Sequence, residues 1–195
     1  MAEPRTTVTA LRVERRGRVA VELDGRAWRI VPAEVVVRAA LEVGRSLDRP
    51  ALRLLRRELR RAEALAAAAR ALRSRDLSSR RLEERLERAD VAPTTRAEAL
   101  SALARSGFVD DSRFAHNRAA ALAERGYGDA AIRLELERHG IGSETRDEAI
   151  GRLEPEPARA RRVIARRGRG PRTARYLAAR GYGEESVAAA AAADS

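Results

Sequence analysis

The sequence predicts a mainly α-helical protein, in which tandem three-helix repeats stack into a curved, elongated solenoid behind a small N-terminal β-rich extension. Three observations support this fold class. From Asp48 onward, apolar residues recur at helical spacing, and a shift of fifty positions lays one helical segment over the next. Before Asp48, apolar and polar residues alternate, which is typical of strands. Aromatic residues make up only 3% of the 195 residues, so Ala, Leu, Val and Ile must form most of the core.

The N-terminal segment is expected to form three short strands and one helix. The strands are expected at residues 8–14, 19–23 and 27–31. Arg16-Gly17 and Asp24-Gly25 are turn signals between them. Three strands alone form a marginal sheet, so they should pack on the helix expected after Pro32, which should stop at Gly44.

A long helix is expected next. Asp48 can cap it and Pro50 suits its first turn. Its apolar stripe consists of Leu52, Leu55, Leu59 and Ala62. The helical pattern breaks near Asp76, and Ser78 or Ser79 can cap the helix that follows.

An internal repeat organises the rest of the chain. A shift of fifty lays residues 69–91 over 119–141 and 96–100 over 146–150, and a third copy follows at 164–182 with a small slip. The aligned apolar pairs are Leu72 with Leu122, Leu77 with Tyr127, Leu82 with Ile132, Leu86 with Leu136, and Val91 with Ile141. The expected divisions are 1–48 for the extension, 49–107 for a linker helix and the first repeat, 108–155 for the second, and 156–195 for the third. Stacked repeats leave a long exposed face, which favours an interaction scaffold over an enzyme.

Two adjacent acids, Asp110 and Asp111, raise the possibility of a metal site with His116 as a third ligand. The spacing argues against it, because the acids precede a helix and His116 lies more than a turn further on. We expect one Asp to cap a helix that starts near Ser112 and the other to pair with Arg113. Phe108 and Phe114 are then expected to anchor this helix in the core.

The segment from Gly126 to Ala131, GYGDAA, fits the spacing of a dinucleotide-binding loop. That loop follows a strand, whereas here a helix precedes it, so no cofactor is expected. Gly126 is instead expected to end the helix with a positive φ, and Tyr127 to fill the corner. Gly128 or Asp129 then begins the next helix.

The helix after this corner carries Ile132 and Leu136 on one face, and we expect Arg133 to pair with Glu137 on another. Gly140 should end it and Ile141 should pack back on it. His139 stands at the helix C-terminus, where a cation is favoured. No set of nucleophile, base and acid can be assembled, so an enzyme is not expected.

The overall charge favours a polyanionic partner. The chain carries 40 basic residues, all arginine, against 29 acidic ones, giving a net charge of +11. It has no cysteine, its first residues lack the pattern of a signal peptide, and no apolar run has the length of a membrane span. We expect a cytoplasmic protein that does not bind membranes.

Residues 106–115 and 125–141 together resemble the signature of the RecX family, bacterial regulatory proteins that bind the RecA recombinase. Residues 71–86 are similar to the family's first repeat, and the likeness extends over about 65–182; the strand-rich N-terminus resembles an extension found in some members. The signature positions are Asp110, Asp111, Arg113, Phe114, Gly126, Tyr127, Gly128, Ile132, Leu136 and Gly140. The resemblance implies three tandem three-helix repeats, no enzymatic activity, direct DNA binding, and binding in the groove of a RecA–DNA filament. It implies a regulator of recombination and DNA repair that usually inhibits strand exchange, ATP hydrolysis and filament growth.

Charge is unevenly distributed along the repeats, which suggests that basic ends contact phosphates of single- or double-stranded DNA while the mixed-charge middle meets a protein. The candidate DNA-binding residues are Arg56, Arg57, Arg60, Arg61, Arg80, Arg81, Arg162, Arg166, Arg167, Arg169, Arg172 and Arg175. Arg133 and Glu137 are the candidates for partner binding. Most of the few aromatic residues occupy predicted core or corner positions, so little base stacking is expected.

Three alternatives stay open. The arginines could simply form a solvated face, the chain could be a helical-repeat adaptor for another protein, or it could coat nucleic acid without acting on RecA. A monomer is expected, because an elongated repeat presents its face without pairing.

Overall fold

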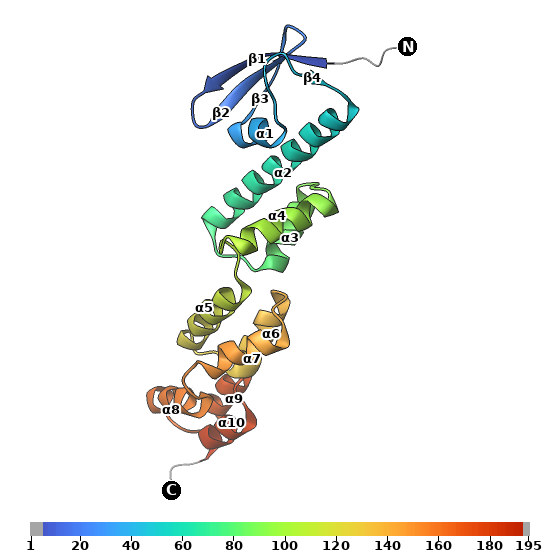
Figure 1. Ribbon diagram of the computed structural model, residues 1–195. Helices are drawn as coiled ribbons and strands as arrows, with labels where there is room; N and C mark the ends of the chain where they lie inside the picture. Colours follow the sequence, from blue (N-terminus) through green and yellow to red (C-terminus); the bar gives the residue numbers. More distant parts are fainter. Residues whose placement is uncertain (1–5, 193–195) are drawn as a thin grey trace. The chain divides into compact units, whose positions relative to one another are not determined.

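The computed structural model describes residues 6–192, and these form two compact units (Figure 1). One unit holds residues 6–74 and 85–101, and the other holds 75–84 and 102–192. The predicted class, mainly helical with a small N-terminal sheet, is confirmed. No helix among residues 6–192 combines the length and the apolar character that crossing a membrane would require.

The sheet of the first unit is antiparallel and has the strand order β3-β2-β1-β4. Its strands are β1 (Thr6–Glu14), β2 (Arg18–Leu23), β3 (Arg26–Pro32) and β4 (Ser46–Leu47). The three predicted strands are confirmed to within two residues. Both predicted turns have the positive φ typical of tight hairpins, 50° at Asp24 and 74° at Gly25 in the second. The two-residue β4 is too short to show an alternating pattern, so the sequence did not predict it.

Helices α1 (Ala33–Arg38) and α2 (Arg49–Ser74) cover one face of the sheet (Figure 1). Val8, Val21 and Val31 from the strands are buried with Leu47 and Leu55 in a shared core. This core follows from the predicted alternation, since the apolar positions of the strands meet the apolar stripe of α2.

The prediction that the helix after Pro32 extends to Gly44 is wrong. Helix α1 ends at Arg38, and Ala40 has a φ of 47°. The chain turns back there towards β1. The amide of Gly44 donates to the Val8 carbonyl at 2.8 Å, and the amide of Val8 donates to the Arg45 carbonyl at 3.0 Å. The predicted cap of α2 is confirmed, since the Asp48 carboxylate accepts the amide of Ala51 at 2.8 Å.

The remaining described helices follow the repeat. They are α3 (Ser79–Arg88), α4 (Pro93–Arg105), α5 (Asp111–Glu124), α6 (Asp129–Arg138), α7 (Ser143–Gly151), α8 (Glu156–Arg167), α9 (Pro171–Ala179) and α10 (Glu184–Ala191). Helices α3 and α6 begin and end fifty positions apart, as the repeat predicts. Their aligned residues Leu82, Leu86, Ile132 and Leu136 are fully buried, and so is Leu177 in α9.

The predicted helix ends around the second repeat are confirmed. Gly126 has a φ of 80° after α5, Gly128 precedes the first residue of α6, and Gly140 has a φ of 77° after it. Phe114 is buried as expected, but Phe108 is 65% exposed, so its predicted core position is wrong. The chain turns at Gly107, where φ is 70°, and Val109 takes the inward position instead.

Candidate nucleic-acid and partner interface

The two adjacent acids of the signature have separate roles. The Asp110 carboxylate caps α5 by accepting the amide of Arg113 at 2.9 Å, as predicted for one of them. The Asp111 carboxylate accepts the amide of Ser79 at 2.8 Å, whereas the Arg113 guanidinium donates to the carbonyl oxygens of Gly107 and Phe108. The predicted pair between the second Asp and Arg113 is therefore wrong, and Asp111 connects two repeats instead.

The Gly-Tyr-Gly corner forms a joint with the third repeat. The amide of Gly128 donates to the carbonyl of Arg180 at 2.9 Å, and the amide of Ala130 to that of Gly181 at 3.1 Å. A Cβ on Gly128 would lie 2.3 Å from the Gly181 oxygen, so the two backbones touch with no room for a side chain. The Glu156 carboxylate completes the joint by accepting the amides of Asp129 and Gly183 at 2.6 and 2.7 Å.

The same joint occurs one repeat earlier. The Ser78 hydroxyl donates to the carbonyl of His139 at 2.7 Å, and Arg80 packs so closely on Gly140 that a Cβ there would lie 2.3 Å from its Cδ. Ser78 corresponds to Gly128, Gly140 to Gly181, and Asp111 to Glu156 in these two joints. Asp111, Gly128 and Gly140 of the signature thus dock one repeat on the next.

A buried arginine reinforces the joint between the second and third repeats. Arg159 in α8 is 4% exposed and forms an ion pair with Asp129. It also donates to the carbonyl oxygens of Glu154 and Tyr127 at 2.9 and 2.8 Å. Arg159 lies within the basic C-terminal segment of the sequence, but its charge is not available to a partner.

Arg180 also contacts residues on both sides of this joint. Its guanidinium is half-buried and lies over the rings of Tyr127 and Tyr176, 4.6 and 5.2 Å from their centres. It donates to the Arg125 carbonyl at 3.0 Å. The rings of Tyr127 and Tyr176 therefore bind an arginine of the same chain.

The exposed arginines of α8 and α9 are the best candidates for phosphate contacts. Arg162 pairs with Glu154, Arg175 donates to the Pro171 carbonyl, and the Arg167 guanidinium lies 4.0 Å from the centre of the Tyr176 ring. Arg166 and Arg172 are exposed and have no hydrogen-bond or ion-pair partner within residues 6–192. Their donors are available to an external anion.

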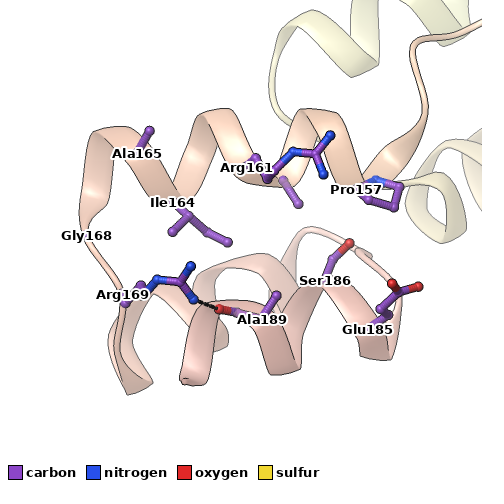
Figure 2. Close-up of a pocket in the computed structure, with 10 residues that line it drawn as sticks. Pro157, Arg161, Ile164, Ala165, Gly168, Arg169, Glu185, Ser186 and Ala189 are labelled. Carbon is purple, nitrogen blue, oxygen red and sulfur yellow. Dashed lines mark hydrogen bonds between the residues drawn. The ribbon is translucent and has the colours of Figure 1, made fainter. Parts of the chain in front are cut away.

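A hollow of about 560 Å³ lies between α8 and α10 beside these arginines (Figure 2). Figure 2 shows Arg161 and Arg169 with Ile164 between them, and Arg169 donating to the Ala189 carbonyl at 2.8 Å. Its lining combines aliphatic side chains such as Ile164 with charged and polar ones, including Glu185 and Ser186 on α10. The candidate residue Arg169 thus lies at the edge of this hollow.

The arginines predicted on α2 divide into two groups. Arg57 and Arg61 bind the carboxylate of Glu58, which is only 5% exposed, at 3.1 and 3.5 Å. Arg56 and Arg60 are exposed, and neither has a side-chain partner in the described part of the chain. Arg53 lies on the same stripe and is equally unpaired there, so it joins the candidates. Arg53 belongs to the same arginine-rich segment of α2. The structure shows that Glu58 neutralises Arg57 and Arg61 but not Arg53.

Arg80 and Arg81 are less available than predicted. Both bind Glu84, at 3.3 and 2.8 Å, and the hydrogen bond from Arg81 is the main cause that lowers the pKa of this carboxyl group. The stem of Arg80 also packs on Gly140, so this side chain has a structural role in the joint between the first two repeats.

The predicted pair of Arg133 and Glu137 is wrong. Arg133 binds Asp147 at 3.0 Å and Glu137 binds Arg146 at 3.8 Å, both partners being in α7. An arginine placed N-terminal to a glutamate is the weaker order for a pair within a helix, so the packed neighbour supplies better partners. Both candidates are nevertheless exposed on α6.

The surroundings of His139 oppose the cation that a helix C-terminus favours. Burial lowers the pKa of His139, and this outweighs the opposing effect of Glu135, whose carboxylate lies 3.4 Å from its Nε2. The ring packs on Phe114 with 5.0 Å between the ring centres. Burial favours the neutral imidazole, which suits this contact with an aromatic ring.

Comparisons with known proteins agree on one family. Residues 110–150 match the family model described as RecX, second three-helix domain. The Regulatory protein RecX of Chromohalobacter salexigens is 37% identical over 129 residues, covering 62% of this chain and 85% of the relative. The one from Halorhodospira halophila is 36% identical over 137 residues, covering 65% of this chain and 85% of the relative.

Two solved structures share the fold. One, a crystal structure of regulatory protein RecX, has a TM-score of 0.79 at 19% identity and covers 93% of this chain and 96% of its own. The other, RecX from Lactobacillus salivarius, has a TM-score of 0.56 at 15% identity and covers 67% of this chain and 93% of its own.

Proposed function

Because the chain belongs to the RecX family of regulatory proteins, we propose that it binds the RecA recombinase and the RecA–DNA filament and inhibits strand exchange and ATP hydrolysis. The observation that carries this proposal is the family relationship, which extends over most of the length of the relatives. The protein acts as a monomeric binding partner in the cytoplasm rather than as an enzyme.

Direct DNA binding is the second part of the proposal. Arg166 and Arg172 in one unit, and Arg53, Arg56 and Arg60 in the other, are exposed and lack partners within the described residues. A guanidinium that is not neutralised internally loses little when it binds a phosphate and releases a counterion from DNA. These five arginines therefore contact the phosphate backbone.

The α6 surface is proposed as the contact with RecA. Arg133 and Glu137 flank Leu134, a large exposed apolar side chain, and their partners Asp147 and Arg146 add two further charges of opposite sign. An exposed apolar residue within a mixed-charge rim is typical of protein interfaces. The second repeat is rich in acidic residues, which repel the phosphates of DNA. This repulsion favours a protein partner for the α6 surface.

Reversing the two unpaired arginines of the third repeat should weaken DNA binding and its salt dependence. We expect Arg166→Glu combined with Arg172→Glu to reduce affinity for single-stranded DNA by roughly tenfold or more at low salt, and to reduce the slope of log K against log salt by about 1.4, since each lost phosphate contact contributes about 0.7. Fluorescence anisotropy of a labelled oligonucleotide across a salt series measures both quantities.

A matched control changes the net charge equally at another place. Arg133→Glu combined with Arg138→Glu alters two exposed arginines of α6 and should leave the salt slope within error of the wild-type value. Equal losses in both double variants would mean that only the total charge matters, and would contradict the assignment to α8 and α9.

Cosedimentation with preformed filaments separates this function from its alternatives. With DNA saturated by RecA, the protein should sediment with the filament, and Leu134→Glu should reduce this recovery while leaving binding to bare DNA intact. An adaptor unrelated to RecA would bind neither DNA nor filament. A protein that only coats nucleic acid would bind bare DNA but not a saturated filament.

A further inference from the structure

The edge strand β3 carries two large apolar side chains that are exposed. Trp28 is 41% exposed and Ile30 is 48% exposed on β3, although most aromatic residues were expected in the core or at corners. Both residues lie on β3, with only Arg29 between them in the sequence. The pairing of β2 and β3 is irregular between Val21 and Glu22, which makes Trp28 the extra residue of a bulge. Bulges redirect side chains and often lie at binding sites.

A groove of about 280 Å³ begins beside Ile30 and lies between β3 and α2. Its lining includes Arg18, Ile30, Pro32, Leu59, Ala66 and Arg70. A neighbouring groove of about 320 Å³ shares Arg70 and adds Arg60, one of the proposed phosphate contacts. All of these residues belong to the first unit.

The charge along the groove is positive. Arg29 and Glu63 neutralise each other at 3.4 Å, whereas Arg70 is exposed without a partner in the described chain, and Arg18 donates only to the carbonyl of Ile30 at 3.0 Å. An apolar aromatic platform followed by a cationic groove is the combination that binds single-stranded nucleic acid, since bases stack on the ring and phosphates follow the cations. The faces of duplex bases are covered by their neighbours, so a duplex cannot use the platform.

We infer that Trp28 and the groove of Arg18 and Arg70 form a site for unpaired bases of single-stranded DNA, separate from the arginines of α8 and α9. The inference rests on the proposed function in its choice of DNA as the ligand. It adds a preference for single strands and assigns that preference to the N-terminal sheet.

Trp28 is the single tryptophan of the chain, so its fluorescence reports on this site alone. Binding of an oligothymidylate to the full-length protein should quench this fluorescence, whereas a duplex of equal length should not. Trp28→Leu should weaken single-strand binding roughly tenfold and duplex binding by less than twofold, and Trp28→Phe should restore most of the loss because it keeps an aromatic face. Arg70→Glu should weaken single-strand binding, and Arg73→Glu, an exposed arginine of α2 outside the groove lining, should do so much less.

Anisotropy of the labelled oligonucleotide, measured in the same titration, separates this site from DNA binding as a whole. If the oligonucleotide binds while Trp28 fluorescence stays unchanged, or if Trp28→Leu binds it as tightly as the wild type, the inference is overturned and the proposed function stands. Quenching by RecA alone, with no effect of the oligonucleotide, would make this face a protein-docking surface and also overturn it. If no DNA binds at all, the proposed DNA-binding function fails with it. Thermal unfolding shows whether each variant stays folded.

Discussion

Replacing Gly128 by alanine should destabilise the second unit by about 3 kcal/mol or more, because the added methyl group collides with backbone rather than with a movable side chain. The new Cβ would lie 2.3 Å from the Gly181 oxygen and 2.4 Å from the Tyr182 nitrogen. To relieve this overlap the two backbones must separate, which breaks the hydrogen bonds from the amides of Gly128 and Ala130. Urea unfolding followed by circular dichroism measures the loss.

Gly142→Ala is the matched control for this substitution. Gly142 precedes α7 as Gly128 precedes α6, both have extended backbones, and no atom lies within 4 Å of a Cβ built on Gly142. The control should therefore cost at most about 1 kcal/mol, the usual effect of alanine at such a position. Equal stability of the two variants would show that the repeats do not dock through the Gly-Tyr-Gly corner.

Replacing Arg159 by methionine should cost about 3–5 kcal/mol, the usual result of removing one partner of a buried ion pair. Methionine retains much of the volume of the side chain, so the loss comes from the polar groups that remain. Asp129 loses its cation, and the carbonyl oxygens of Tyr127 and Glu154 lose their donor.

A second substitution tests this explanation. Asp129→Asn in the Arg159→Met background removes the unpaired charge and should recover part of the lost stability in urea unfolding. Arg161→Met, at an exposed position two residues along α8, is the control and should stay within about 0.5 kcal/mol of the wild type. If Arg159→Met is as stable as Arg161→Met, the buried network does not hold the joint.

Features that depend on neighbouring residues could be predicted from the sequence. Local pattern and backbone preference predict the strands, the cap at Asp48 and the helix ends at Gly126 and Gly140. The fifty-residue register follows from the internal repeat of the sequence. Features that depend on residues distant in the sequence could not be predicted. Asp111 meets Ser79 from another repeat, and β4 exists only because the chain after α1 returns to Val8.

The candidate site shows the same division. The sequence identifies the arginine-rich segments, but burial decides which of their charges are available. Arg159 and Arg166 lie seven residues apart in α8, yet one is enclosed by Asp129 and carbonyl groups while the other is exposed. Trp28 is exposed at an irregularity in the pairing of β2 and β3, which the sequence pattern does not reveal.

Hydrolysis of ATP by RecA on single-stranded DNA tests the proposed regulation most directly. With DNA in excess over both proteins, so that competition for DNA has no effect, the wild-type chain should lower the rate as its concentration approaches that of RecA. The variant with Arg166→Glu and Arg172→Glu should need roughly tenfold more protein for the same effect, in line with its weaker DNA binding. An unchanged rate with the folded wild-type chain at several-fold excess over RecA would contradict the proposal that it regulates the recombinase.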